Sequence, residues 1–460
     1  MSMVRSEVVP RVLFVTPLAF NHFTGGGVTF SNLFRGWPKD RLFTVHADQM
    51  PVTTDTCVHY YALSSDELPL AGPLQRLRSL LGRGGAAEPA APGPAFDGPA
   101  VGSVPRVGIA KKLALKAANV VFGNSGLPVS ARLSARLIDW IEQAKPDVLY
   151  TILGSIEMME LVEKIRRRFD IPVVVHLMDD WRAERERYGL LSPLRRRRLH
   201  ALFNRSMRMA SAHLAISDAM AKTYGAEFGV PFVSIQNVID SDRWLSAGRR
   251  KVAAGRPAQL LYAGSLYAEV QLEALLEIAA SVARLRRQGA ALDLNVMAPD
   301  FMIEPFRRRL EAHDGTRIVD QVPRERYFER LCEADVLLLP ANFSDAAVRM
   351  VRYSMPTKVP EFLVSGVPIL LYAPADIAQV DYARQAGWGL AVTERAPAVL
   401  DAAIARIVGD DAVRQRLVDA GRATAASRHD ASEVRALFRE TLRKAGRSRV
   451  ESNKRSCEVA

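Results

Sequence analysis

The chain has 460 residues and a formal net charge of +12, and 48% of its residues are hydrophobic against 24% charged. This length exceeds what one hydrophobic core usually holds, and the composition excludes a disordered or fibrous protein, so we expect two globular domains. The three cysteines are odd in number, far apart and without metal-ligand spacing, so they suggest neither a disulfide framework nor a zinc site. The N-terminal residues lack a signal-peptide pattern, and no apolar run reaches the roughly 18 to 20 residues that span a bilayer. We therefore expect a cytoplasmic protein.

Short apolar runs rich in Val, Ile and Leu, each followed by a helical pattern, recur along the first half of the chain. Such runs are typical of buried parallel strands, which we predict at residues 12–15, 148–152, 173–177 and 213–216. Residues 82–106 hold too few large apolar side chains to pack and are predicted to be a flexible insertion. Residues 1–245 are expected to form one Rossmann-like domain.

A second series of the same kind occupies the rest of the chain. It predicts strands at residues 260–263, 292–297, 317–319, 336–339, 369–372 and 390–392. Gly, Ala, Arg and Pro interrupt the pattern at residues 246–257, the predicted linker. Residues 258–430 then form a second Rossmann-like domain, followed by a helix at 431–446 and a disordered basic tail at 447–460. The predicted fold class is α/β, with two doubly wound parallel-sheet domains facing each other across a cleft.

Three consecutive glycines, Gly25, Gly26 and Gly27, follow the first predicted strand and open a helical pattern. Glycines at this place let backbone amides and a helix N-terminus approach an anion closely. Their spacing differs from the G-x-G-x-x-G fingerprint, which argues against a nicotinamide or flavin cofactor. A simple tight turn explains the three glycines equally well.

The most informative segment is RYSMPTKVPEFLVSGVPILL, residues 352–371. We expect Thr357 to cap a helix, and we expect Lys358 and Glu361, three residues apart, to share one face of it. A cation and free amides at the helix start suit a diphosphate, and a carboxylate one turn further suits ribose hydroxyls. The alternative is an ion pair on the surface of a structural helix.

The run S-x-P-x-K-x-x-E-[FY]-L-x-x-G-x-P, which follows the strand DVLLLP, resembles the donor-site segment of family 4 glycosyltransferases of the GT-B fold. The segments QNVIDSDRW, LLYAGSL and PRERYFERLCEADVLLLP resemble family segments in the same order, so the likeness covers most of residues 231–393. RVLFVTP, PVVVHLMDD and SAHLAISDAM match the N-terminal half more loosely. The resemblance implies a metal-independent transferase that uses a UDP- or GDP-sugar, with no cofactor and no metal site.

Carried over by position, the resemblance makes Glu361 the ribose-binding carboxylate and assigns the glycine loop to the donor phosphate or sugar. The rest of the implied donor site is Gly264, Ser265 and Lys358. The resemblance places His176, at the end of a predicted strand, near the transferring sugar as a catalytic residue, and the alternative is a buried structural histidine. On the acceptor side, Asp179 and Asp180 orient hydroxyls or cap the next helix.

Two positions depart from the family pattern. Tyr353 stands where the family has the first of two glutamates, and Ser265 stands where it has an arginine. The diphosphate charge must then be met elsewhere. Lys358 is the first candidate for that role, and Arg349 and Arg352 are further ones.

The predicted function is transfer of a sugar from a nucleoside diphosphate to an acceptor hydroxyl, with retention at the anomeric carbon, in bacterial cell-surface polysaccharide or glycoconjugate synthesis. One alternative is an inverting glycosyltransferase in which His22, on the acceptor side, is the general base. Another is a catalytically silent GT-B protein that binds a nucleotide sugar or a partner enzyme.

A basic segment precedes the last predicted strand of the first domain. Its arginines are Arg195, Arg196, Arg197 and Arg198, followed at helical spacing by Leu199, Leu202, Phe203 and Met207. One interpretation is a solvated face over a packed seam. The other is a basic amphipathic helix that contacts an anionic membrane, at the inner face of the cytoplasmic membrane, where a glycan or lipid-linked acceptor is held. The basic clusters lack interleaved aromatics, which argues against nucleic acid as a partner.

Overall fold

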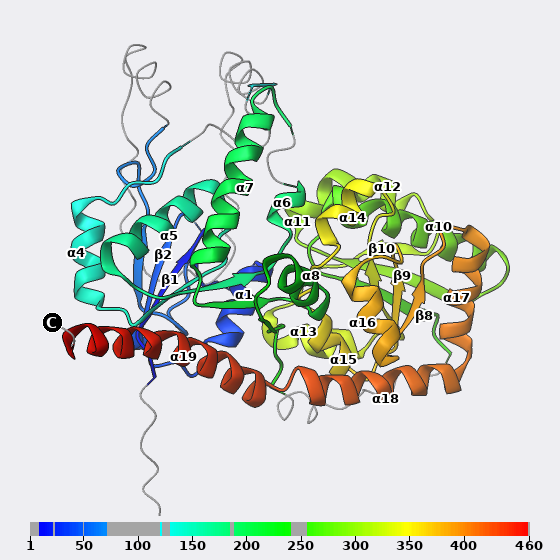
Figure 1. The fold of residues 1–460 in the computed structure, drawn as a ribbon. Helices are drawn as coiled ribbons and strands as arrows, with labels where there is room; N and C mark the ends of the chain where they lie inside the picture. Colours follow the sequence, from blue (N-terminus) through cyan, green and yellow to red (C-terminus); the bar gives the residue numbers. More distant parts are fainter. Residues whose placement is uncertain are drawn as a thin grey trace, which may run out of the picture.

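The computed structural model describes residues 9–21, 24–48, 50–70, 120–121, 129–184, 188–240 and 255–458. The insertion predicted at 82–106, most of the predicted linker and His22 lie outside these ranges. Figure 1 shows two α/β domains side by side, each built on one sheet. The predicted fold class is confirmed, because every strand pairing in both sheets is parallel.

The first sheet has seven strands in the order β3-β2-β1-β4-β5-β6-β7. Its strands are β1 (Val12–Thr16), β2 (Leu42–His46), β3 (His59–Ala62), β4 (Val148–Thr151), β5 (Val173–Leu177), β6 (Ala212–Ala215) and β7 (Phe232–Ser234). Its helices include α1 (Gly25–Leu33), α4 (Ala135–Ala144), α5 (Ile156–Phe169), α6 (Trp181–Glu184), α7 (Ser192–Met209) and α8 (Asp218–Phe228). All residues of β1, β2, β4 and β5 are buried, as expected for strands covered by helices on both faces.

The second sheet has six strands in the order β10-β9-β8-β11-β12-β13. They are β8 (Ala258–Ala263), β9 (Leu292–Met297), β10 (Thr316–Ile318), β11 (Val336–Pro340), β12 (Ile369–Tyr372) and β13 (Gly389–Val392). The helices around it are a π-helical turn (Ala268–Leu272), α10 (Glu273–Arg287), α11 (Asp300–Ile303), α12 (Arg307–Glu311), α13 (Arg324–Cys332), α14 (Asp345–Val351), α15 (Val359–Val364), α16 (Ala378–Ala386), α17 (Pro397–Gly409) and α18 (Asp411–Arg428). Strand order reverses between β8 and β11, and in open parallel sheets ligands bind at the carboxyl ends of strands beside such a point.

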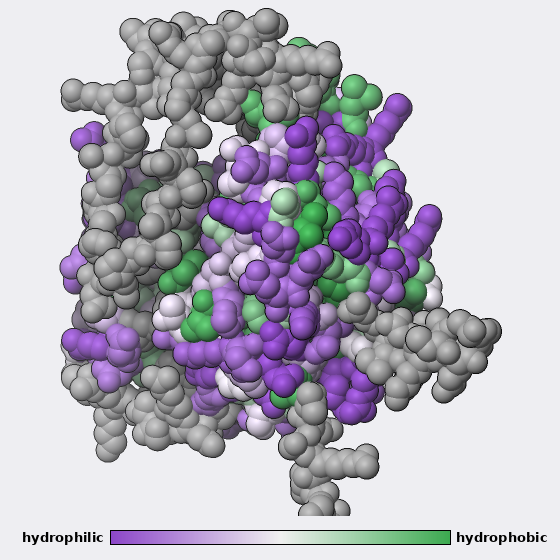
Figure 2. Space-filling model, turned by 90° about the vertical axis from the view of Figure 1, so that its left-hand side faces the viewer, coloured by the Kyte–Doolittle hydropathy of each residue, from purple (hydrophilic) through white to green (hydrophobic). Residues whose placement is uncertain are grey.

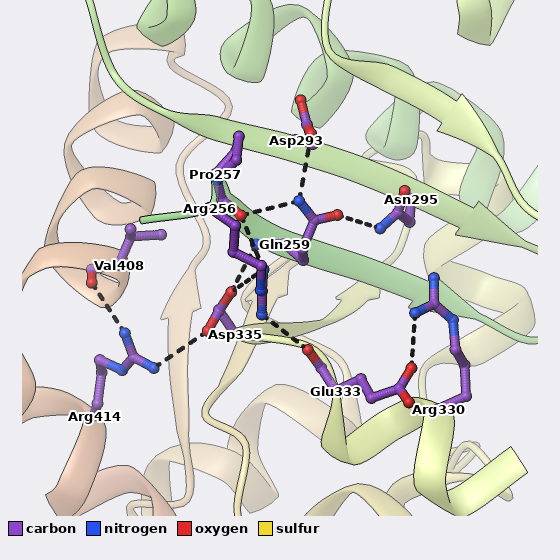
Figure 3. Close-up of polar contacts among 10 residues, drawn as sticks. All are labelled: Arg256, Pro257, Gln259, Asp293, Asn295, Arg330, Glu333, Asp335, Val408 and Arg414. Atoms are coloured by element: carbon purple, nitrogen blue, oxygen red, sulfur yellow. Dashed lines mark hydrogen bonds and ion pairs between the residues drawn. The ribbon is translucent and has the colours of Figure 1, made fainter. Parts of the chain in front are cut away.

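A polar network closes the opposite end of this sheet, near the strand starts (Figure 3). The Asp335 carboxylate accepts a hydrogen bond from Gln259 N at 2.8 Å and pairs with Arg256 at 2.9 Å. The Gln259 side chain donates to Asp293 at 3.3 Å and accepts from Asn295 at 2.6 Å. Since buried carboxylates are costly without partners, these contacts stabilise the start of the second domain.

The chain crosses between the domains a second time after α18. Helix α19 (Ala431–Glu458) returns to the first domain, where Phe438 packs edge-on against Phe34 and Tyr150 of its core. Figure 1 shows α18 and α19 following one another along the lower side of both domains. The helix continues through most of the segment for which we predicted a disordered tail, because the Arg, Lys and Glu residues there are good helix formers.

The two crossings of the chain are hydrogen-bonded to each other. Ile239 N donates to His429 O at 2.9 Å, and Ala431 N donates to Ile239 O at 3.1 Å. The fully buried His429 ring lies 2.9 Å from Asn237 O and 2.8 Å from the Tyr382 hydroxyl. These bonds make a compact joint between the domains.

Candidate active site

The carboxyl end of the first sheet meets the start of α15 in the second domain. Helix α1 begins at Gly25, directly across from Thr357. Thr357 Oγ1 lies 3.4 Å from both the Gly25 carbonyl oxygen and Thr29 Oγ1, and Asn237 Nδ2 donates to the Thr357 carbonyl at 2.6 Å. The glycine loop and the S-x-P-x-K-x-x-E segment, more than 300 residues apart in the chain, therefore come together as the two sides of one site.

Thr357 does not cap the helix as we predicted. The residue at the N-cap position of α15 is Lys358, without a side-chain cap bond, and Thr357 lies one residue earlier with its hydroxyl turned to the first domain. The prediction was wrong by one residue because Pro360, which is tolerated only in the first turn, fits either start equally well.

Lys358 lies against the first strand of the second sheet. Its amine donates to the carbonyl of Ala263 at 2.9 Å and lies 4.4 Å from the centre of the Tyr262 ring. Burial lowers the pKa of Lys358 to about 7, against the smaller opposing influence of the Glu361 carboxylate. The Lys358 amine is therefore held by a backbone carbonyl of the neighbouring strand.

Gly264 lets Lys358 reach this position. Its φ of +140° lies in the region that favours glycine, and a Cβ there would lie 2.9 Å from the Lys358 amine. The carbonyl of the next residue, Ser265, accepts a hydrogen bond from the Tyr262 hydroxyl. The loop of Gly264 and Ser265 thus adjoins Lys358 at the strand end, and Glu361 follows one turn into α15, partly buried.

The three glycines of the loop have different surroundings. A Cβ on Gly25 would lie 3.1 Å from Thr357 Oγ1, so this glycine permits the close approach of the two domains. A Cβ on Gly27 would lie 2.5 Å from the Asn21 side chain, whose oxygen accepts from Thr24 N at 2.8 Å. Gly26 has ordinary room, with the nearest atom 3.4 Å away. Two of the three positions therefore need glycine for packing.

A second contact between the domains involves the loop before Thr357. Ser217 Oγ donates to the Tyr353 carbonyl at 2.6 Å, and the Ser354 hydroxyl donates to Asp179 at 2.8 Å. The Tyr353 ring packs edge-on against Tyr224, with 6.3 Å between ring centres. Tyr353 thus packs against the first domain instead of supplying a carboxylate.

His176 is fully buried at the end of β5. Its Nδ1 lies 2.7 Å from the Tyr150 hydroxyl and its Nε2 lies 3.2 Å from Ile235 O, so both ring nitrogens are engaged. Burial lowers the pKa of the imidazole to about 3, which keeps the ring neutral. This arrangement fits the structural histidine that we kept as the alternative, and the catalytic role of His176 stays a prediction.

The remaining predicted residues are placed as follows. Asp180 accepts from Ala183 N at 3.3 Å and from the Tyr224 hydroxyl at 2.7 Å, which is the helix-cap role. Asp179 is exposed and contacts the second domain through Ser354. Arg352 pairs with Asp376 at 3.2 Å, whereas Arg349 lies partly buried on α14.

Sequence reasoning missed the polar side chains that join the two sides of the site. Asn32 donates to Asn237 at 3.1 Å, and Asn237 in turn donates to the Thr357 carbonyl. Both asparagines are buried. The only signal in the sequence was Asn237 itself, inside the QNVIDSDRW segment, because a buried asparagine needs polar partners.

Among the residues that the structure describes, no group of His, Cys, Asp and Glu side chains is arranged to hold a metal ion. Likewise, no described helix is both long enough and apolar enough to span a bilayer.

Comparison with known proteins agrees with this architecture. Residues 86–238 match the model of the glycosyl transferase 4-like domain. Among solved structures, HepE of Anabaena in complex with UDP-glucose superimposes with a TM-score of 0.59 at 11% identity, covering 94% of this chain and 99% of HepE. The α,α-trehalose 6-phosphate synthase of Burkholderia multivorans superimposes with a TM-score of 0.61 at 12% identity, covering 97% of this chain and 99% of the synthase. WaaG, a glycosyltransferase involved in lipopolysaccharide biosynthesis, superimposes with a TM-score of 0.54 at 13% identity, covering 94% of this chain and 99% of WaaG. No curated protein matches the chain in sequence.

The structural neighbours establish the fold, which is the GT-B arrangement of two facing Rossmann-like domains. The match of residues 86–238 to the glycosyl transferase 4-like model adds the class of activity. The resemblance to family 4 glycosyltransferases is therefore confirmed, and the chain is a glycosyltransferase of the GT-B fold.

Proposed function

We propose that this glycosyltransferase moves a sugar from a nucleoside diphosphate, with UDP favoured over GDP, to an acceptor hydroxyl with retention at the anomeric carbon. The observation that carries the proposal is the position of Lys358, whose amine lies beside Gly264 at the end of β8. UDP is favoured because HepE was solved with UDP, UDP-glucose, and UDP with glucose.

Lys358 and Glu361 would divide the recognition of the donor between them. The Lys358 amine, which lies beside the loop of Gly264 and Ser265, would pair in its protonated form with the diphosphate, while Glu361, one turn further, would accept hydrogen bonds from ribose hydroxyls. The start of α1 at Gly25 approaches from the other domain and would bring backbone amides to the phosphate or sugar.

In the reaction, the bond between the anomeric carbon and the diphosphate oxygen breaks and a bond to the acceptor oxygen forms. The electron pair of the broken bond stays on the diphosphate, and the acceptor proton is taken up by that leaving group. The protein would contribute by holding both substrates in place and by stabilising the developing phosphate charge with Lys358. Asp179, exposed at the end of β5, would orient the acceptor.

A thermal-shift experiment tests the donor site. A ligand that binds only the folded state raises its melting temperature, so the protein would be melted with UDP, GDP and ADP, and again as Lys358→Met and Glu361→Gln. We expect stabilisation by UDP that both variants lose and that the control Lys222→Ala, at an exposed lysine on α8, keeps. No stabilisation by any nucleotide would refute the proposed donor site.

Two alternatives give different outcomes. The first alternative is a catalytically silent protein, which the presence of Tyr353 in place of a carboxylate supports. Such a protein would bind UDP but would transfer no sugar from UDP-glucose to any glycan acceptor. An inverting enzyme with His22 as the base would form a product of inverted configuration at the anomeric carbon, and His22→Ala would abolish its activity. Analysis of the product by NMR separates inversion from retention.

A role in bacterial cell-surface polysaccharide or glycoconjugate synthesis fits the proposed reaction, and screening of glycan and lipid-linked acceptors tests that role.

A further inference from the structure

His46 and Asp48 form a hydrogen-bonded pair at the carboxyl end of β2. His46 Nδ1 lies 2.7 Å from Asp48 Oδ1, and only 6% and 8% of the two side chains are exposed. The other carboxylate oxygen accepts a hydrogen bond from Ala19 N at 2.9 Å. When the ring is neutral, the carboxylate keeps its proton on Nδ1, and Nε2 is then a hydrogen-bond acceptor of fixed orientation.

The Nε2 atom of His46 is available to a further partner. Within the described part of the chain, no residue hydrogen-bonds Nε2, and Nε2 is not among the enclosed polar atoms that lack a partner, so it keeps access to solvent. The ring packs edge-on against Tyr60, with 5.8 Å between ring centres. Both ring nitrogens of His176, by contrast, are engaged inside the first domain. His46 therefore presents an imidazole nitrogen with which a ligand can form a hydrogen bond.

The pair lies at the end of the first sheet where a ligand is expected. His46 and Thr16 are register partners on β2 and β1, so their side chains share one face of the sheet. Helix α1 covers this face, because Phe14 on β1 packs edge-on against Phe30 of α1 at 5.0 Å. Strand order reverses between β1 and β4, one strand away from His46, and ligands of open parallel sheets bind at the carboxyl ends beside such a point.

A run of hydrogen bonds joins Asp48 to the glycine loop. Asp48 accepts from Ala19 N, and the carbonyl of Ala19 accepts from Asn21 Nδ2 at 3.0 Å. Asn21 Oδ1 accepts from Thr24 N at 2.8 Å, and Thr24 Oγ1 accepts from Gly27 N at 3.1 Å. The loop before α1 is thus held between the His46–Asp48 pair and the helix start that faces the second domain.

The described surface of the first domain is mostly hydrophilic on the side that Figure 2 shows. The hydrophobic residues there lie in small separate groups among hydrophilic ones. The apolar stripe of α7, which comprises Leu199, Leu202, Phe203 and Met207, is buried as a packed seam. A ligand rich in hydroxyl groups therefore suits this domain better than a broad apolar partner.

We propose that His46 is an acceptor-binding residue, whose Nε2 accepts a hydrogen bond from a hydroxyl of the acceptor sugar and whose orientation Asp48 fixes. The inference rests on the proposed transferase function and adds a contact on its acceptor side. Because neighbouring strands lie about 4.8 Å apart, a disaccharide bound at the point of strand reversal can reach the end of β2. The reacting hydroxyl is a different one, so the proton balance of the transfer is unchanged.

Two substitutions of His46 separate contact with a sugar from a purely structural role. His46→Asn keeps an amide N–H near the position of Nδ1, so it can still donate to Asp48, but it has no acceptor at the position of Nε2. His46→Gln keeps an amide at the position of Nε2 and gives up the bond to Asp48. A structural pair predicts that His46→Gln is the damaged variant, whereas a sugar contact predicts that His46→Asn loses sugar binding.

Saturation-transfer NMR measures the binding of the methyl glycosides of glucose, galactose, mannose and N-acetylglucosamine, with and without UDP. We expect at least one of these probes to bind the unchanged protein. Its dissociation constant should rise about five- to tenfold in His46→Asn, since a single hydrogen bond contributes about this much, and by no more than about twofold in His46→Gln. His59→Asn, at the amino end of β3, is the matched control and should bind the probe normally.

Asp48→Asn tests the same contact without changing the histidine. Ala19 N can only donate, so the new amide oxygen stays with it and the amide nitrogen turns toward His46 Nδ1. The ring proton then moves to Nε2, which no longer accepts, and binding of the probe should fall as in His46→Asn. Asp48→Asn keeps the proposal testable even if His46→Asn does not fold, which melting curves show.

Binding of UDP, measured separately, should be equal in all variants. Its absence from the unchanged protein would refute the donor site and not the contact of His46. No binding of any methyl glycoside to the unchanged protein, or normal binding by folded His46→Asn or Asp48→Asn, would overturn the proposal.

Discussion

The affinity for UDP-glucose should fall as the pH rises from 6 to 8, because Lys358 loses its proton in this range. Its amine is buried beside Ala263 and Tyr262, and this burial lowers its pKa to about 7. A diphosphate pairs with the ammonium form and not with the neutral amine. Binding therefore competes with deprotonation of Lys358 above this pKa.

The size of the effect follows from the protonated fraction of the free protein. With a pKa of about 7, roughly nine tenths of Lys358 is charged at pH 6 and roughly one tenth at pH 8, so the apparent dissociation constant should rise about tenfold. His176 does not contribute, because burial lowers its pKa to about 3 and it stays neutral throughout this range.

Isothermal titration calorimetry with UDP-glucose at pH 6, 7 and 8 measures the effect. UDP-glucose is the better probe because its diphosphate, unlike the terminal phosphate of UDP, has no proton to lose near pH 6. Lys358→Met keeps the length of the side chain without the amine, so it should bind weakly and equally at all three pH values. A constant affinity of the unchanged protein, or the same pH dependence in Lys358→Met, would refute the reasoning.

Four further substitutions test the surrounding structure. Gly27→Ala should lower the free energy of unfolding in urea by about 1–3 kcal/mol, since its Cβ would lie 2.5 Å from the Asn21 side chain. Gly26→Ala, which has room, should be neutral or stabilise by up to about 1 kcal/mol, and equal effects would contradict this distinction. Asp335→Ala should cost about 3 kcal/mol, because it removes the carboxylate that Arg256 and the β8 backbone share, and an unchanged urea midpoint would contradict that role. His176→Phe should cost about 1–3 kcal/mol by leaving the Tyr150 hydroxyl without its partner, yet keep sugar transfer within about tenfold. A loss of transfer beyond a thousandfold in a folded His176→Phe protein would restore His176 to a catalytic role.

The sequence alone determined the fold class and most of the strands. All six strands of the second sheet lie where their apolar runs predict them, because strands covered on both faces are nearly continuous hydrophobic segments. The strands not predicted, β2, β3 and β7, give a weaker signal. Strand β2 contains the buried polar residues Thr44 and His46, and β3 and β7 lie at the sheet edges with mostly half-buried side chains.

The sequence also predicted the proposed donor segment, because the lysine, proline and glutamate of S-x-P-x-K-x-x-E lie at fixed local spacing at one helix start. Only the tertiary structure decided what each side chain does there. The contact of Thr357 with Gly25, the enclosure of Lys358 beside Ala263 and the engagement of both His176 nitrogens join residues that are 26 to 332 positions apart. Local periodicity records whether a position is apolar or polar, but burial and hydrogen-bond partners at such separations depend on how the two sheets are brought together.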